Sequence, residues 1–128
     1  MDNAQLLKGI LEGCVLAVIE KGETYGYEIL GELEKAGLED IGEGTLYPVL
    51  TRLDKNKLIQ CRRAKSPLGP IRKYYSITQE GAEYLGDFRE RYRRISKSAD
   101  ILLYDNSSEM EENENGKNDS VLYQGLPV

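Results

Sequence analysis

The chain of 128 residues contains no histidine and only two cysteines. Histidine is the usual general base of nucleophilic catalysis, and histidine and cysteine are the usual protein ligands of zinc. The phosphate-binding motifs GxGxxG and GxxxxGKS/T are missing as well. We therefore expect that the protein is not an enzyme and that it has no catalytic residues, no metal site and no cofactor.

The two cysteines, Cys14 and Cys61, are too few and too isolated to form a disulfide framework. Both fall at apolar positions, so we expect small buried hydrophobic residues, with a thiol switch as the minority alternative. No run approaches the ~20 apolar residues of a membrane span, and the start MDNAQLLKG has no basic segment leading into an apolar run. We expect a soluble, cytoplasmic protein that does not bind membranes.

The net charge of −5 is unevenly distributed along the chain. Residues 100–128 hold seven acidic residues and one lysine, a net charge of −6, which leaves +1 for residues 1–99. Within residues 43–75 there are eight basic and two acidic residues, a local charge of +6. A basic patch of this kind indicates a polyanionic partner.

Apolar spacing predicts two helices in the first forty residues. From Ala4 to about Lys21 apolar residues recur at helical intervals, and a glycine follows as a stop. Thr24 is expected to be the N-cap of a second helix, which ends at Gly37 in a left-handed turn. Two short helices in this order are typical of the start of a helix-turn-helix domain.

The segment GEGTLYPVLTRLDKNKLI, residues 42–59, predicts a third, amphipathic helix. Its core side is expected to consist of Leu46, Val49, Leu50 and Leu53. At 100° per residue, the opposite side carries small residues first and basic residues behind them: Gly44, Pro48, Thr51, Arg52 and Lys55. A proline near the first turn loses little, because its missing N–H has few partners there. A helix that enters a DNA major groove needs such a side.

After residue 58 the pattern changes from helix to strand. The segments IQCRRAK and RKYYSIT are β-prone and flank SPLGP, a loop with two prolines and a glycine. They predict a basic β-hairpin. Three helices followed by such a hairpin make a winged helix-turn-helix, so the expected fold class is mainly α with a small β-hairpin.

Thr78 is expected to cap a long helix that reaches about Tyr104. Apolar residues repeat along it at spacings of 3, 4, 3, 4 and 3: Leu85, Phe88, Tyr92, Ile95, Ala99 and Leu102. Such a heptad seam predicts a homodimer interface, although the part near Leu85 is expected to pack on its own domain.

We therefore divide the chain into three parts. Residues 1–78 form the winged helix-turn-helix DNA-binding domain, and residues 79–104 form the C-terminal dimerisation helix. Residues 105–128 are an acidic tail that is expected to be disordered, since it is too polar to bury a core.

Four segments carry a resemblance to a known family: LLKGILEGCVLAVIEKGETYGYEIL, GTLYPVLTRLDKNKLI, GPIRKYYSIT and EGAEYL. In this order they resemble the PadR family of bacterial transcriptional regulators, over about residues 5–104. The resemblance implies a winged-helix DNA-binding domain, a C-terminal helix that dimerises, repression of nearby genes and, in some members, induction by a phenolic compound or drug. The chain is similar to the smaller members, which have one C-terminal helix, and the acidic tail lies outside the similarity.

Ten residues form the predicted contact surface for double-stranded DNA. Gly44 allows a close approach, and Thr45, Pro48, Thr51 and Arg52 are expected at base edges or the groove wall. The phosphate contacts are assigned to Tyr47, Lys55, Lys65, Arg72 and Lys73. Each group has a plainer alternative. Arg52 and Lys55 could belong to a solvated helix face, and the basic residues of the hairpin could protect a strand edge from pairing. The tyrosines could pack in the core with the hydroxyl at its rim.

The predicted function is a homodimeric transcriptional regulator, a repressor rather than an activator, that binds a partly palindromic operator. A small aromatic or hydrophobic effector is the partner that the resemblance adds. The alternative from another class is a winged-helix protein-interaction module without direct DNA binding. Such a module needs no local charge of +6, and its binding would depend much less on salt.

Overall fold

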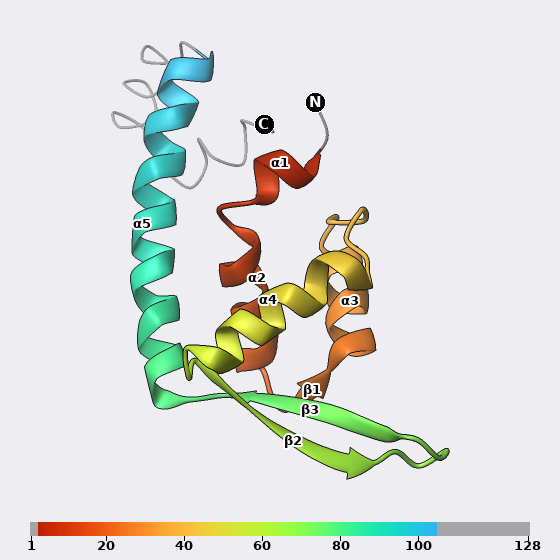
Figure 1. Cartoon of the computed structure of the whole chain (residues 1–128). Coiled ribbons are helices and arrows are strands. Elements are labelled where there is room, and N and C mark those ends of the chain that lie inside the picture. The colour runs from red at the N-terminus through yellow and green to blue at the C-terminus, as the bar shows by residue number, and fades with distance from the viewer. Residues whose placement is uncertain (1–2, 105–128) are drawn as a thin grey trace. The chain divides into compact units, whose positions relative to one another are not determined.

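The computed structural model of the chain describes residues 3–104, so the predicted tail of residues 105–128 lies outside the described part. Five helices and three strands follow one another in this part (Figure 1): α1 (Asn3–Leu7), α2 (Leu11–Glu20), β1 (Thr24–Tyr25), α3 (Gly26–Lys35), α4 (Glu43–Lys55), β2 (Ile59–Lys65), β3 (Ile71–Ile77) and α5 (Gln79–Tyr104). The described residues up to Arg89 form one compact unit, and those from Glu90 onward belong to a second.

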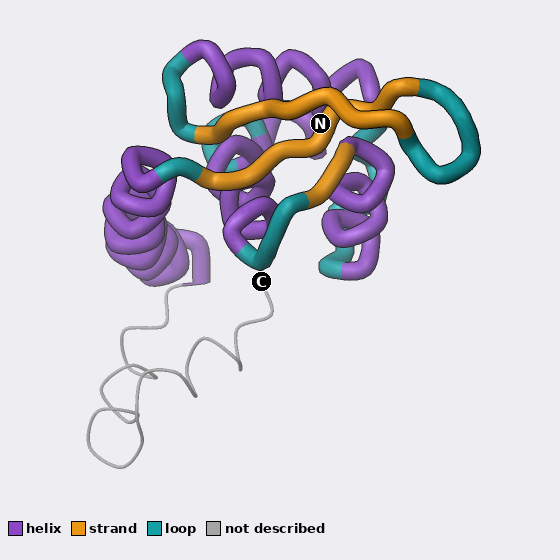
Figure 2. Tube along the Cα trace, turned by 90° about the horizontal axis from the view of Figure 1, so that it is seen from below, coloured by secondary structure: helices purple, strands orange, loops and turns teal. Residues whose placement is uncertain are grey.

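Helices α2, α3 and α4 and a three-stranded antiparallel sheet make up most of the first unit. The strand order is β1-β3-β2, so β3 lies in the middle. Figure 2 shows the sheet on one side of these helices, with the loop between β2 and β3 projecting beyond them. The architecture is a winged helix-turn-helix, as the sequence predicts.

The prediction of a single first helix over residues 4–21 is wrong, because the structure divides it into α1 and α2. Residues 8–10 form a turn in which the Ile10 N–H donates to the Leu7 carbonyl at 2.9 Å. Gly9 lies in this turn, and glycine is a poor helix former because it loses the most conformational entropy on ordering. No atom of residues 3–104 lies within 4 Å of the position that a Cβ of Gly9 would occupy, so packing within this part does not hold the segment helical either.

The start of the second predicted helix also differs from the expectation. Thr24 is not its N-cap but a residue of β1, paired with Tyr75 of β3, and its hydroxyl donates to Glu28 at 2.6 Å. Threonine and tyrosine favour extended backbone, and the pairing places them at the edge of the sheet. The predicted end is confirmed: Gly37 has a φ of 104°, and the next N–H closes back onto the Leu33 carbonyl at 2.9 Å.

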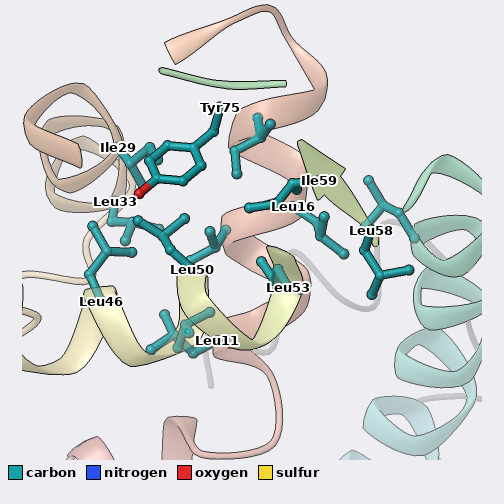
Figure 3. Close-up of a cluster of buried hydrophobic side chains, with 14 residues drawn as sticks. Leu11, Leu16, Ile29, Leu33, Leu46, Leu50, Leu53, Leu58, Ile59 and Tyr75 are labelled. Atoms are coloured by element: carbon teal, nitrogen blue, oxygen red, sulfur yellow. The ribbon is translucent and has the colours of Figure 1, made fainter. Parts of the chain in front are cut away.

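The core of the described chain is one cluster of buried hydrophobic residues from α2, α3, α4, α5 and the strands (Figure 3). From α4 it takes the four residues that the helical period predicts: Leu46, Val49, Leu50 and Leu53. Truncating one such leucine to alanine typically costs about 2–5 kcal/mol of folding free energy. This packing fixes which side of α4 faces outward.

The predicted hairpin is confirmed, and its register is continuous from Ile59 opposite Ile77 to Lys65 opposite Ile71. Tyr75 points into the core, as its alternation with Ile77 predicts, and is 5% exposed. Figure 3 shows its ring beside Ile29. The two-residue strand β1 was not predicted, because a segment so short has no period of its own.

Helix α5 begins where Thr78 was expected to cap it. The Thr78 hydroxyl accepts a hydrogen bond from the Gly81 N–H at 2.9 Å and donates one to the Lys57 carbonyl at 2.7 Å. Leu85 is 1% exposed and belongs to the core of its own chain, which removes it from the predicted dimer seam. Phe88 is half-buried and its ring lies over Gly13. The first turns of α5 therefore complete the winged domain.

None of the helices between residues 3 and 104 is long and apolar enough to cross a bilayer.

Candidate nucleic-acid interface

The side of α4 that faces away from the core is accessible along its whole length. All seven residues of this helix in the predicted contact set are exposed: Gly44, Thr45, Tyr47, Pro48, Thr51, Arg52 and Lys55. The turn of 100° per residue places Gly44, Thr51 and Lys55 at the centre of this side. Tyr47 and Arg52 then lie on its two flanks. The Thr51 hydroxyl donates to the Tyr47 carbonyl at 3.0 Å, which leaves its oxygen available as an acceptor.

The small residues at the start of α4 are not required by internal packing. A Cβ at Gly44 would meet no atom of the described residues within 4 Å. Pro48 lies inside the helix and cannot donate a hydrogen bond to the Gly44 carbonyl. The Gly44 carbonyl therefore lacks the helical donor four residues on. The start of the helix therefore lacks bulky side chains on its exposed side, so another molecule can approach its backbone closely.

The flank that carries Tyr47 faces α3. A Cβ on Gly26 would collide with the Tyr47 hydroxyl, so the close approach of the two helices depends on this glycine. Tyr27 lies nearby, and its hydrogen bond with Glu43 raises the pKa of the Tyr27 phenol. A groove of about 340 Å³ runs past these tyrosines to the wing, the hairpin of β2 and β3 with its connecting loop. The groove is lined by Tyr25, Gly26, Tyr27, Tyr47, Pro70, Ile71, Arg72, Lys73 and Tyr75.

The other flank, which carries Arg52, faces α1 and α2. The Arg52 Nε donates to the Glu12 carboxylate at 3.4 Å, and the Tyr84 hydroxyl donates to the other oxygen of the same carboxylate at 2.9 Å. A cavity of about 330 Å³ lies along this flank, lined by Ala4, Leu7, Lys8, Leu11, Glu12, Asp40, Ile41, Gly44, Thr45, Pro48, Val49 and Arg52. One edge of the exposed side of α4 is therefore recessed.

The outer face of the wing holds its arginines in contacts with the protein itself. Arg62 forms two hydrogen bonds to Glu23, at 2.6 and 2.8 Å, and these bonds lower the pKa of the Glu23 carboxyl group. The Arg62 guanidinium lies 4.9 Å from the centre of the Tyr74 ring. Arg72 lies 4.0 Å from the centre of the Tyr25 ring, which packs edge-on against Tyr74. Arg72 of the predicted contact set is thus engaged on this outer face.

The opposite face of the wing carries three cations. Arg63 pairs across the strands with Lys73, and the period of two places Lys65 on the same face. All three are exposed, and none forms an ion pair with another described residue. Tyr75 shares this face and points into the core, so the three cations point toward the side of the sheet that α4 occupies. Like charges repel one another, and a polyanion relieves that repulsion.

Three neighbours of this surface were not in the predicted set. Arg63 could have been found from its alternation with Lys65, because residues two apart on a strand share a face. Tyr27 and Glu12 carried no signal in the sequence, since they reach α4 only through the packing of α3 and α2 against it. No group of acidic residues and cysteines within residues 3–104 is arranged to hold a metal ion.

Helices α2, α3 and α4, the exposed side of α4, and a hairpin with three cations that form no ion pair within residues 3–104 define a winged helix-turn-helix protein of the DNA-binding class. The model of the "Transcriptional regulator PadR-like family" matches residues 15–87. The chain belongs to this PadR-like family, whose members are transcriptional regulators and not enzymes. It is accordingly a DNA-binding regulator of transcription, which confirms the coarser part of the predicted function.

Solved structures agree with this membership. A PadR-like transcriptional regulator from Bacillus cereus is 45% identical, with a TM-score of 0.69 over 77% of this chain and 96% of that one. A transcriptional regulator from Streptococcus is 44% identical over the same shares, with a TM-score of 0.67. A PadR-like transcription factor from Bacteroides fragilis is 35% identical over 79% of this chain and 99% of that one, with a TM-score of 0.66.

Proposed function

We propose that two copies of the chain bind a partly palindromic operator in double-stranded DNA and repress the adjacent genes. One observation carries the DNA contact: three cations that lack an ion pair among the described residues point toward the side of the sheet that α4 occupies, and α4 itself has an exposed side. A protein-interaction module would need no such uncompensated charge. The resemblance to the family supports repression, and action on the chromosome supports a cytoplasmic location.

Within this proposal α4 enters the major groove. Gly44 and Pro48 permit the approach, Thr45, Thr51 and Arg52 read base edges or the groove wall, and Tyr47 and Lys55 hold phosphates. On the wing, Lys65 and Lys73 hold phosphates together with Arg63. Arg72 stacks on Tyr25, so we propose that it stiffens the wing against β1 and contacts DNA only secondarily.

The dimer is proposed from the second half of α5. Ile95 is 68% exposed and Leu102 is 83% exposed, and both belong to the heptad seam, which in this half of α5 also includes Tyr92 and Ala99. Phe88 of the predicted seam lies in the first half and packs over Gly13 of its own chain. Two copies that pair along this seam bury Ile95 and Leu102. A small aromatic or hydrophobic effector is carried by the family resemblance, and we propose it only as a modulator of the same DNA binding.

The test begins with selection of genomic DNA fragments by the purified protein, which yields an operator duplex. Affinities for this duplex and for a shuffled duplex of the same composition are then measured by fluorescence anisotropy at several salt concentrations. For the unmutated protein, log affinity should fall linearly with log salt concentration. A failure to prefer any fragment, or affinity that is insensitive to salt, would contradict the proposal and favour a protein partner.

Variants separate the two kinds of contact. Arg52→Ala should lower the affinity for the operator by about 1–3 kcal/mol and leave the shuffled duplex nearly unaffected, because an arginine that reads guanine contributes only to the matching sequence. Lys65→Ala and Lys73→Ala should each weaken binding to both duplexes by the same factor. Each should also reduce the slope of log affinity against log salt concentration by about one. Equal losses on both duplexes for Arg52→Ala would refute its assignment.

A further inference from the structure

The carboxylate of Glu12 joins three helices at one point. It extends from α2, and its two oxygens accept hydrogen bonds from Arg52 of α4 and from Tyr84 of α5. The Glu12 side chain is only 25% exposed, so the packing of α2 and α5 restricts where the carboxylate can lie. The hydrogen bond to Glu12 also raises the pKa of the Tyr84 phenol. Arg52, by contrast, is 57% exposed and reaches outward from the flank of α4.

The atom of Arg52 that Glu12 holds is Nε, at the inner end of the guanidinium group. The two terminal nitrogens form no hydrogen bond with any other residue in the described part of the chain. A guanidinium presents its donors in a fixed plane, so holding Nε orients the terminal pair as well. The terminal pair is one of the edges with which arginine recognises guanine O6 and N7.

We propose that Glu12 is a positioning residue for sequence readout: bonded to Tyr84, it holds the Nε of Arg52 and aims the two terminal nitrogens at a guanine in the operator. A free arginine side chain loses much rotamer freedom when it binds, and the bond to Glu12 removes part of that loss before DNA arrives. Since Tyr84 lies on α5, the orientation of the Arg52 guanidinium group depends on how α5 packs against α2.

The same contact has a rival interpretation with opposite consequences. A carboxylate beside the DNA surface also repels phosphates and competes with them for Arg52. If that were its main effect, removing Glu12 would strengthen binding to every sequence. If Glu12 positions Arg52, its removal weakens binding to the operator selectively. The two interpretations therefore differ in the sign of the change on the operator.

The experiment measures affinities for the selected operator duplex and the shuffled duplex for the full chain and for Glu12→Ala. We expect the ratio of the two affinities to fall by about fivefold or more, while affinity for the shuffled duplex holds or rises slightly. The matched control is Glu20→Ala, which removes the same charge from the same helix. Glu20 pairs with Arg89 of α5 and not with a residue of α4. The control substitution should change both affinities by one common factor of less than about twofold.

A double-mutant cycle tests whether Glu12 acts through Arg52. In an Arg52→Ala background, Glu12→Ala should no longer change the affinity ratio. Tyr84→Phe, which keeps the ring and removes only the hydroxyl, should lower the ratio by about twofold in the unmutated background, a smaller loss than that of Glu12→Ala. Should Glu12→Ala fail to show a cooperative unfolding transition, Glu12→Gln takes its place with Tyr84→Phe, and the expected direction is the same.

The inference rests on the proposed DNA binding, and the outcomes separate the two. If the unmutated protein binds both duplexes equally, the proposed function fails. If it prefers the operator and the Glu12 variants keep that preference, or strengthen binding to both duplexes, then the positioning role of Glu12 is overturned while the proposed function stands.

Discussion

At the scale of single residues, two glycines five positions apart on α5 have different surroundings. A Cβ on Gly81 would fall on the Leu58 carbonyl oxygen and lie 2.8 Å from the Ile77 side chain, and the backbone atom cannot move aside. A Cβ on Gly86 would meet nothing within 4 Å in the part of the chain that the structure describes. Gly81 therefore allows α5 to approach the turn between α4 and β2, whereas no described residue packs closely on Gly86.

The two glycines lead to opposite predictions for stability. Gly81→Ala should lower the free energy of unfolding by about 1–3 kcal/mol or more, because the added methyl forces the backbone apart. Gly86→Ala should raise it by about 0.5–1 kcal/mol, since alanine loses less entropy in a helix. Urea unfolding measures the free energy of unfolding of each variant and of the unmutated protein. A neutral Gly81→Ala would show that α5 can shift freely on the winged domain.

Tyr75 gives a prediction for alkaline pH. Burial raises the pKa of its phenol from an ordinary value of about 10 to about 12. The folded chain therefore retains this proton more tightly than the unfolded chain, so the stabilisation is complete below pH 10 and is lost as pH rises toward 12. Comparing urea unfolding of the unmutated protein and Tyr75→Phe isolates this effect, because all other titrating groups are shared. The stability difference between them should change between pH 9 and pH 11; a constant difference would contradict the assignment.

At the scale of elements, the junction between the wing and α5 depends on one hydroxyl. Thr78 caps α5 through the Gly81 N–H and bonds to the Lys57 carbonyl in the turn after α4. Lys57 itself has a φ of 65°, and the following N–H closes onto the Leu53 carbonyl at 2.9 Å. The cap thus joins the end of the proposed recognition helix to the start of the proposed dimerisation helix.

Removing this cap should be costly. Thr78→Ala is expected to lower the free energy of unfolding by about 0.5–2 kcal/mol, the usual range for a lost N-cap. Thr51→Ala makes the same chemical change on the exposed side of α4, where the hydroxyl only bonds back to Tyr47, and should be neutral or slightly stabilising. Both are measured by chemical denaturation. Equal effects of the two substitutions would show that the Thr78 hydroxyl has no special role.

At the scale of the whole molecule, a single winged domain offers a limited surface to DNA. Such single modules bury only about 600–1,000 Å² of protein surface, which is modest for specific binding. The proposed pairing of two chains through α5 would double the contact, and two-fold symmetry would then require an inverted-repeat operator with half-sites about 34 Å apart. Oligomeric state and operator symmetry are therefore linked.

The dimer prediction is tested at Ile95. Ile95→Glu places a charge in the seam and should convert a dimer into a monomer that no longer occupies both half-sites. Arg94→Glu, one position away and outside the seam, changes the charge by more and should leave the dimer intact. Light scattering at micromolar concentration measures both variants. A monomeric unmutated protein, or selected DNA sites without two-fold symmetry, would contradict the model.

The sequence by itself determined the local features of this protein. The period of 3.6 residues identified the core side of α4 and hence its exposed side, because every fourth or third residue shares a face. Alternation placed Tyr75 inward, and the residue types at Thr78 and Gly37 marked a helix start and a helix end. These are short-range effects, in which each residue acts through its own backbone and its near neighbours.

Tertiary structure alone decided which side chains meet across elements. Thr24 became a strand residue because β3 lies beside it, and Phe88 lies over Gly13 because α5 packs on α2. Arg72 stacks on Tyr25, and Arg52 meets Glu12, only because the sheet and α2 bring together residues 40 or more positions apart. No period or motif encodes such pairs, since they depend on how the elements pack against one another in three dimensions.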